Sequence, residues 1–382
     1  MEHKELDIHL AKRPAQLEEV KKKGVKIIGY FPGNYVPEEI IYASGAVPLC
    51  LVHGGSPSAD AALSVLPDII CPFARAQIGE RALKNNPYYS MIDMLVAPIT
   101  CQHLKKVAET WEYYGDIEIF KLGIPHQYDG DFELIYYANR LIALRDMLQA
   151  FTGNEITGEK ISQAIDLYNK MREFLKKISL LRRGPDSPLR ALDFFKLNHA
   201  SFYADPVFMV DILDSVYNEL MEKQPVKRED TPRLLMLAPN MAYGDYKIPE
   251  LVQAAGGEIV IEEICEGIRY YWKGIEKKGD LFQSLAEGYL ADRLPCAFMT
   301  GSAKKRLDFA LNLVTDFNVS GVIWYELINC ETYDSESYFF AQKMGERNMP
   351  VLILESDYGT ADVGQLKVRI EAFMEMIKGG TE

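Results

Sequence analysis

The sequence predicts an α/β fold in which two parallel-sheet domains are separated by a helical insertion. Short apolar runs, of the kind that strands covered on both faces require, alternate with helical segments in residues 25–130 and again in 229–382. Residues 131–228 carry apolar side chains at helical spacing alone. The two α/β parts also repeat the same order of strands, prolines and cysteines. We therefore expect two flavodoxin- or Rossmann-like sheets that form an internal repeat.

An amphipathic helix is expected over residues 1–24, ahead of the first α/β domain at 25–130. Pro72 stands at the first position of an expected helix, where the missing N–H of proline is tolerated. The apolar runs of this domain predict strands at 25–31, 47–52, 94–99 and 117–122. The segments that follow them predict helices at 37–43, 72–83 and 103–114.

Residues 131–228 are expected to be a helical region, because Leu141, Leu144 and Leu148 recur at the spacing of one helix face. A loop is predicted at 184–188 and a polar linker at 223–232. The second α/β domain is expected at 229–382. Its strands are predicted at 234–237, 259–264, 321–327 and 351–355, and its helices at 249–255, 303–317, 335–347 and 363–376.

Composition narrows the class of protein. The chain has 382 residues, of which 48% are hydrophobic, and a net charge of -13, which argues against nucleic acid as the main partner because phosphate binding needs a basic face. Residues 1–15 are charged and lack the apolar stretch of a signal peptide, and no window resembles a membrane span. We expect a soluble cytoplasmic protein.

The cysteines divide evenly between the two α/β parts. No Cys-x-x-Cys is present, and disulfides are not expected in a cytoplasmic chain. Each cysteine of the first part has a counterpart at the matching strand end or helix start of the second, and the pairs are Cys50 with Cys265, Cys71 with Cys296, and Cys101 with Cys330. The alternative is six separate core thiols, because free cysteine is among the most buried residue types.

The paired cysteines indicate an iron–sulfur site. Thiolates are soft ligands that select iron–sulfur clusters, zinc or copper(I), and a [4Fe–4S] cluster usually takes four of them. Strand ends that face each other across two domains would bring the six thiols into one cleft. Cys50 lies inside an expected strand, so it is the weakest ligand candidate.

Several segments together carry a resemblance to a known family. They are the run from Val36 to Pro48, Cys71-Pro72, Thr100-Cys101, Asn329-Cys330 after an apolar strand, and the run from Glu355 to Leu366. Over nearly its whole length the chain resembles the 2-hydroxyacyl-CoA dehydratase and benzoyl-CoA reductase subunit family. Its six cysteines and residues 357–366 are most similar to the double-cubane cluster proteins of that family.

The resemblance implies a homodimer that carries an [8Fe–9S] double-cubane cluster. Its implied ligands are Cys50, Cys71, Cys101, Cys265, Cys296 and Cys330. It also implies a separate ATP-hydrolysing iron–sulfur reductase that supplies low-potential electrons for reducing a small molecule; the chain has no nucleotide-binding motif of its own. The sequence departs from the family at Gln102, where aspartate is common, and has no Cys-x-Cys around Cys296.

Three other interpretations stay open. A dehydratase or reductase subunit of the same family would need only Cys71, Cys101 and Cys330 on one [4Fe–4S] cluster. An electron-storage or relay protein would have no substrate of its own. An ordinary α/β binding protein would simply bury its cysteines.

Two residues are candidates for acid–base chemistry. His103 follows Cys101 by two positions and could donate a proton. The alternative is that it is a solvent-exposed histidine in the first turn of the expected helix, with no chemical role. Glu326 lies in an apolar strand ahead of Cys330, where burial would raise its pKa and make it an acid. Arg269 could offset cluster charge or lie on the surface.

Overall fold

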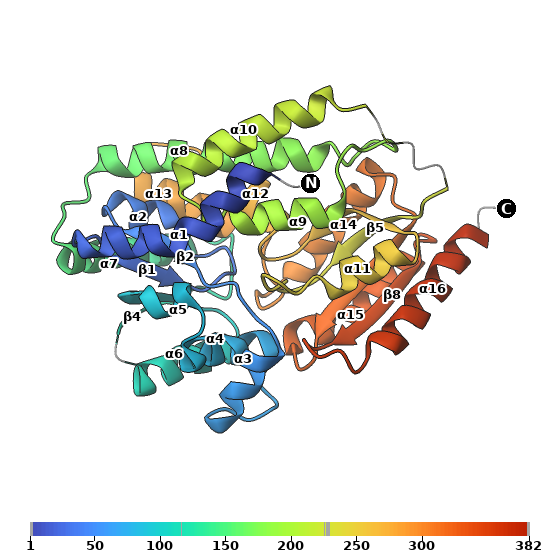
Figure 1. Ribbon diagram of the computed structural model, residues 1–382, viewed down its shortest axis with the longest axis horizontal. Coiled ribbons are helices and arrows are strands. Elements are labelled where there is room, and N and C mark those ends of the chain that lie inside the picture. Colours follow the sequence, from blue (N-terminus) through green and yellow to red (C-terminus); the bar gives the residue numbers. More distant parts are fainter. Residues whose placement is uncertain (1–2, 116, 225, 227–229, 380–382) are drawn as a thin grey trace.

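The computed structural model describes residues 3–115, 117–224, 226 and 230–379. Its architecture is α/β, with two separate sheets and helices packed around both, which confirms the predicted fold class (Figure 1). Residues 225 and 227–229 of the predicted linker lie outside the described part, and the domain boundaries drawn from the sequence stay predictions.

The first sheet has four parallel strands in the order β2-β1-β3-β4. These are β1 (Ile27–Tyr30), β2 (Val47–Cys50), β3 (Met94–Ile99) and β4 (Glu118–Gly123). The second sheet repeats this topology as β6-β5-β7-β8, again all parallel. Its strands are β5 (Arg233–Leu237), β6 (Glu258–Glu263), β7 (Gly321–Leu327) and β8 (Val351–Ser356). The identical strand orders confirm the internal repeat.

Helices cover both faces of the sheets. Around the first sheet lie α1 (Lys4–Lys22), α2 (Glu38–Ala43), α3 (Ser56–Ala61) with the 3₁₀ turn η1 (Ala62–Ser64), α4 (Pro72–Leu83), α5 (Pro87–Met91) and α6 (Gln102–Tyr114). The insertion supplies α7 (Asp131–Thr152), α8 (Gly158–Leu180), α9 (Ala191–Ala200) and α10 (Pro206–Glu222). The second half contributes α11 (Lys247–Ala254), α12 (Ile268–Tyr271), α13 (Leu281–Ala286), the π-helical η2 (Glu287–Asp292), α14 (Ser302–Asp316), α15 (Glu331–Gly345) and α16 (Val363–Gly379).

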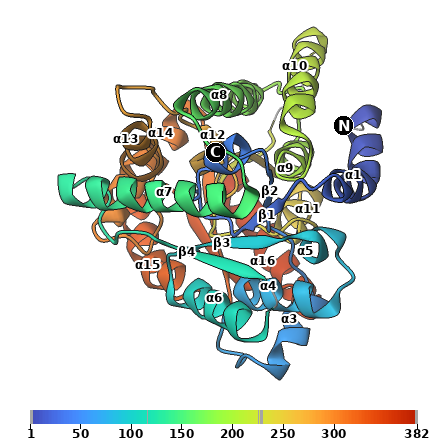
Figure 2. The ribbon, with the colours of Figure 1, turned by 90° about the vertical axis from the view of Figure 1, so that its left-hand side faces the viewer.

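The layers explain why the central strands are apolar throughout. Figure 2 shows α7 on one side of β3 and β4, with α4 and α6 on the other side. All seven residues of β7 are buried, as parallel strands between two helical layers require. None of the described helices is long and apolar enough to span a membrane.

The carboxyl ends of the two sheets meet. Tyr243, in the loop after β5, donates its backbone N–H to the carbonyl of Val52 just beyond β2 at 2.8 Å. Asn329, two residues after β7, donates its side-chain amide to the carbonyl of Asp68 in the first half at 3.1 Å. Ligands of open parallel sheets bind at this edge, so the contact region is where a functional site is expected.

Candidate functional site

Three cysteines occupy equivalent local positions, each as the residue that immediately precedes a helix. Cys71 caps α4, Cys101 caps α6 and Cys330 caps α15. The first turns of α4 and α6 direct backbone N–H groups at their sulfur atoms: Phe73 and Ala74 at Cys71, and the corresponding groups of α6 at Cys101. Free N–H groups and the helix dipole favour a thiolate at such a position.

The thiols of Cys71, Cys101 and Cys330 influence one another. Burial raises the pKa of Cys71 well above its usual value, and the neighbouring thiols of Cys330 and Cys101 raise it further. Burial likewise raises the pKa of Cys330 to about 12, with Cys101 and Cys296 contributing. As thiolates, these three side chains would repel one another. A positively charged centre bound between them would remove that repulsion and stabilise the ionised form.

Cys265 and Cys296 form a second group next to the first. The pKa of Cys296 is lowered to about 5, because the Cys265 thiol donates a hydrogen bond to its sulfur and the guanidinium groups of Arg269 and Arg306 lie nearby. Arg269 is 2% exposed, and its Nη1 donates to the Cys265 sulfur at 3.0 Å. This pair therefore holds one thiolate in a positively charged setting. Cys101 links the groups, since Cys296 contributes to its raised pKa.

Cys296 differs from the position that its pairing with Cys71 suggested. It lies in the loop after η2, six residues ahead of Ser302, the first residue of α14, and caps no helix. Its carbonyl instead accepts a hydrogen bond from the N–H of Met299 at 3.0 Å, and its own N–H donates to the Tyr35 hydroxyl at 3.1 Å. The loop of Cys296 is thus fixed by a residue of the first half.

Cys50 is set apart from the other five cysteines. It is the last residue of β2 and lines a small chamber whose walls also include Glu38, Glu266, Tyr30 and Arg293. Burial raises its pKa well above the usual value; Glu266 and Glu38 raise it further, and a hydrogen bond from Tyr30 opposes them. The groups that act on Cys50 are thus carboxylates and a phenol rather than another thiol.

The chamber nevertheless adjoins the other thiols. Glu266, on its wall, directly follows Cys265 in the chain. Asn34, also on the wall, donates its side-chain amide to the Cys265 carbonyl, and its backbone carbonyl accepts from Arg293 Nη1 at 3.2 Å. The chamber that Cys50 lines thus also contains the residue that directly follows Cys265.

The donor set suits a polynuclear cluster better than a single metal ion. Within the described residues, no three His, Cys, Asp or Glu side chains converge as the ligands of one ion would. Cysteines that hold an iron–sulfur cluster bind different iron atoms, so they do not need to meet at a point. Soft thiols, helix N-termini and buried arginines are all present at the site, and these groups fit an anionic iron–sulfur cluster.

His103 is partly buried and contacts the loop of Cys71. Its Nδ1 accepts a hydrogen bond from the backbone N–H of Cys71 at 3.2 Å, so the proton of the neutral ring is on Nε2. Burial lowers the pKa of His103, against a small opposite effect of Glu331. The residue therefore connects the Cys71 and Cys101 loops as a neutral side chain. Its predicted role as a proton donor stays a prediction.

Glu326 is buried in β7, at 5% exposure. Burial raises its pKa to about 7, although the indole N–H of Trp324 donates to Oε2 at 3.2 Å and opposes the shift. It lies near enough to Cys330 to raise that thiol's pKa. The expected raised pKa is present, while a catalytic role for Glu326 stays a prediction.

The pKa of Glu326 leads to a testable dependence of stability on pH. Its carboxyl ionises near pH 4.5 when unfolded and near pH 7 when folded, so the native state binds the extra proton between these values and stability falls as pH rises through them. We expect Glu326→Gln to be more stable than the parent by on the order of 1 kcal/mol at pH 8, and equal to it near pH 4. Urea unfolding at both pH values measures this.

The matched control is Glu355→Gln. Glu355 is the exposed neighbour of Glu326 across the β7–β8 register. The charge of Glu355 makes only a minor contribution to the raised pKa of Glu326, after burial and Asp334, so this variant should show a much smaller gain at pH 8. Equal gains in the two variants would contradict the burial argument.

Some residues of the site were not foreseen from the sequence. Glu266, whose pKa burial raises to about 7, and Tyr35 were not singled out. Nor was Arg306, although it shares the apolar stripe of α14 with Ala310 and Leu313 at helical spacing. A cation on a buried stripe is the signal that could have identified it.

Comparison with known proteins places the chain in a family. The profile described as 2-hydroxyglutaryl-CoA dehydratase, D-component, matches residues 34–377. YjiM of Escherichia coli (strain K12), whose assignment as a dehydratase subunit is itself provisional, is 26% identical over 94% of this chain and 93% of its own length. The (R)-phenyllactyl-CoA dehydratase beta subunit of Clostridium sporogenes is 21% identical over 94% of each chain.

A third relative is one of the subunits of the benzoyl-CoA reductase of Thauera aromatica, which is 21% identical over 92% of this chain and 91% of its own length. The relatives thus include subunits of both dehydratases and a reductase, at low identity but over nearly the full chain. The family profile and the full-length relatives agree, and the protein belongs to the 2-hydroxyglutaryl-CoA dehydratase D-component family.

Proposed function

We propose that the protein is an iron–sulfur reductase component that carries an [8Fe–9S] double-cubane cluster. The ligands would be Cys50, Cys71, Cys101, Cys265, Cys296 and Cys330. Electrons would come from a separate ATP-hydrolysing iron–sulfur reductase, and the protein, as a homodimer, would pass them to a small molecule. When bound, such a cluster supplies electron transfer at low potential.

The observation that supports this proposal best is the placement of the thiols. Three precede helices in the region where the carboxyl ends of the two sheets meet, and two more form a hydrogen-bonded pair beside buried arginines. Separate core thiols would not be expected to gather from loops that are up to 259 residues apart (Cys71 to Cys330). Membership of a family that contains dehydratase and reductase subunits agrees with it.

Protein groups around the thiols have distinct tasks in this proposal. Arg269 donates to the Cys265 sulfur and would offset the negative charge of a bound cluster. His103 holds the Cys71 loop through its Nδ1, which accepts the backbone N–H of Cys71. Glu326 has a pKa of about 7, which lets it hold a proton at neutral pH and release it to a nearby acceptor.

A second candidate function rests on the separation of Cys50. In it, Cys71, Cys101 and Cys330 alone would hold one [4Fe–4S] cluster, and the protein would act as a dehydratase- or reductase-type subunit with a different partner subunit. The three thiols act on one another, whereas Cys50 interacts with Glu266, Glu38 and Tyr30. The fourth iron would then have no protein thiolate and could bind substrate.

Metal and sulfide analysis of anaerobically purified protein tests both. About eight irons and nine sulfides per chain would support the double cubane, and about four irons would overturn it in favour of the single cluster. No iron after anaerobic reconstitution would overturn both. Reduction of the loaded protein by the ATP-dependent partner, without turnover of any small molecule, would indicate an electron relay instead.

A further inference from the structure

A series of buried ion pairs starts at the Cys265 thiol. Arg269, which donates to the Cys265 sulfur at 3.0 Å, also pairs through its Nε with Glu263. The other carboxylate oxygen of Glu263 accepts from Arg306 Nη2 at 3.3 Å, and Arg306 Nη1 pairs with Glu336. The side chains of Arg269, Glu263 and Arg306 are at most 2% exposed, and that of Glu336 is 14% exposed. Cations and carboxylates thus alternate in this ion-pair series, which ends at Glu336.

The last member of the ion-pair series belongs to the helix that begins after Cys330. Glu336 lies in α15, six positions beyond Cys330, which is about 9 Å along the helix axis. Tyr333, one turn earlier, is 1% exposed, and its ring centre lies 4.8 Å from the guanidinium carbon of Arg306 and 5.6 Å from that of Arg269. The start of α15 therefore packs against both arginines.

Both members of the Arg306–Glu336 pair lie within electrostatic reach of Cys296. A hydrogen bond from Cys265 lowers the pKa of Cys296 to about 5, and the charge of Arg306 is among the further causes. Burial raises the pKa of Glu336, the charge of Arg306 opposes this, and the charge of Cys296 raises it further. A cation and a carboxylate of one ion pair thus act on the same sulfur with opposite signs.

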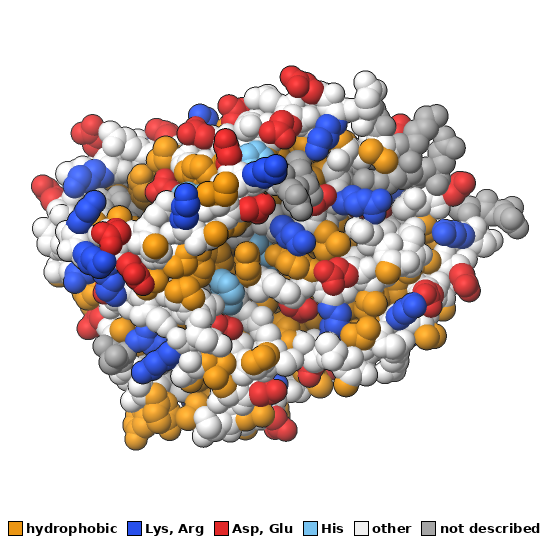
Figure 3. All heavy atoms as spheres, in the orientation of Figure 1, with side chains coloured by type: hydrophobic (Ala, Val, Ile, Leu, Met, Phe, Trp, Pro, Cys, Tyr) orange, Lys and Arg blue, Asp and Glu red, His pale blue; other side chains and the backbone are white. Residues whose placement is uncertain are grey.

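Burial makes these charges act more strongly than charges on the surface. Figure 3 shows lysines and arginines interspersed with aspartates and glutamates over the face that it draws. Exposed charges are screened over about 10 Å at an ionic strength of about 0.1 M, whereas buried charges are screened much less. Removing one charge from the ion-pair series should therefore change the potential at the thiols more than removing one from the surface.

We propose that Arg306 and Glu336 are positioning residues that set the electrostatic potential at the Cys296 sulfur, with Arg306 making it more positive and Glu336 limiting that effect. The effect on the thiol itself needs no bound group. Its consequence for a cluster rests on the function proposed above. Reduction adds negative charge, so a cluster at a more positive site has the higher reduction potential.

The test compares two alkylating reagents on the full-length, metal-free protein. Iodoacetate is an anion and iodoacetamide is neutral, and both react with the thiolate. The ratio of their rates at Cys296, measured by mass spectrometry of its peptide, therefore reports the local potential and not the thiolate fraction. We expect Glu336→Gln to raise the ratio of iodoacetate to iodoacetamide rates about threefold, and Arg306→Gln to lower it by a similar factor. The double variant should return the ratio close to that of the parent.

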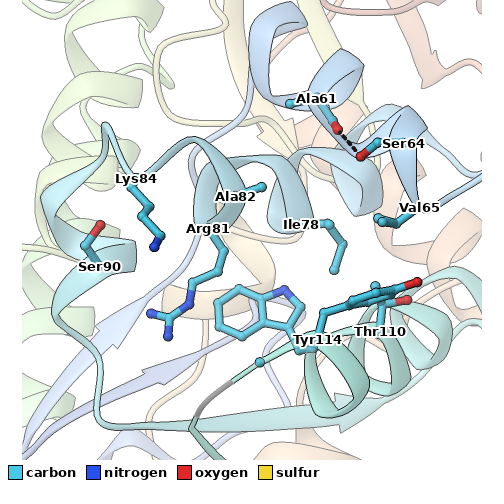
Figure 4. Close-up of a pocket in the computed structure, with 12 residues that line it drawn as sticks. Ala61, Ser64, Val65, Ile78, Arg81, Ala82, Lys84, Ser90, Thr110 and Tyr114 are labelled. Carbon is cyan, nitrogen blue, oxygen red and sulfur yellow. Dashed lines mark hydrogen bonds between the residues drawn. The ribbon is translucent and has the colours of Figure 1, made fainter.

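Two control variants make the same changes of charge away from the thiols. Glu346, ten positions beyond Glu336 at the end of α15, pairs with Lys343 at 2.7 Å and is 48% exposed. Lys84 caps the end of α4 and lines a cavity of about 600 Å³ (Figure 4), with no cysteine among the described lining residues. Glu346→Gln and Lys84→Gln should leave the ratio at the parent value.

In protein reconstituted with iron and sulfide, the reduction potential should rise in Glu336→Gln and fall in Arg306→Gln. A threefold effect corresponds to roughly 30 mV for a one-electron couple. A failure to bind iron would overturn the proposed function, whereas the alkylation ratios would still decide this inference. Equal ratios in Glu336→Gln and Glu346→Gln would overturn it, as would changes of the same sign in Glu336→Gln and Arg306→Gln. If Arg306→Gln fails to fold, the comparison of Glu336→Gln with Glu346→Gln is sufficient.

Discussion

Replacing Cys71, Cys101 or Cys330 singly with serine is expected to remove most of the iron that the parent protein retains after anaerobic reconstitution. Each thiol precedes a helix, Cys330 and Cys101 raise the pKa of Cys71, and Cys101 raises that of Cys330. Serine offers a hard hydroxyl that stays protonated, whereas iron–sulfur clusters select soft thiolates. These positions are shared by both proposed clusters, so this result is expected from either.

Cys50→Ser is the variant that separates the two. With six ligands it should lower iron and sulfide content and alter the visible absorption spectrum. With three ligands it should retain about four irons, because Cys50 would only line the chamber beside Glu38 and Glu266. Circular dichroism and melting of the metal-free variants show that a loss of iron does not reflect unfolding. Full iron retention in Cys71→Ser, Cys101→Ser and Cys330→Ser would contradict both ligand sets.

The local signals of the sequence were sufficient for the fold. Cys71-Pro72 predicted a helix start because proline suits the first helical position, and α4 begins there. The helix after Cys330 begins earlier than predicted, at Glu331 instead of residue 335. Glu331 and Asp334 lie in its first turn, where acidic side chains favour the helix dipole. That signal was readable, and it places Cys330 directly at a helix N-terminus.

The sequence analysis singled out the thiols of the candidate site but not the residues that surround them. Pro37-Glu38 and Pro249-Glu250 look alike in the two copies, yet Glu38 is buried and Glu250 exposed. The difference arises because Arg172, 134 residues beyond Glu38, comes from the helical insertion that only the first copy contacts in this way. Pairing between distant segments depends on tertiary packing, which neither periodicity nor spacing encodes.

The same arginine gives the largest expected loss of stability. Arg172, in α8, pairs through Nη2 with Glu38 at 3.0 Å and through Nη1 with Glu39 at 2.7 Å, and all three side chains are at most 5% exposed. Arg172→Met would leave two carboxylates buried without a cation. Removing one partner of a buried pair costs about 3–5 kcal/mol, so we expect a lower urea midpoint and a melting temperature reduced by roughly 5 °C or more.

Arg183→Met is the matched control, because Arg183 pairs with Asp316 at 3.1 Å while both side chains are about half exposed. Exposed pairs contribute about 0–1 kcal/mol, so this variant should melt close to the parent. The cost of Arg172→Met should shrink as pH falls toward 5, since burial raises the pKa of Glu38 and its protonation removes a buried charge that Arg172 no longer balances. Equal melting of the two variants would show that the buried pairs do not hold α2 against α8.

Because Glu38 also accepts a hydrogen bond from the Tyr270 hydroxyl at 2.6 Å, a displaced Glu38 should disturb the helix that follows Cys265. Iron retention by Arg172→Met should therefore fall together with its stability.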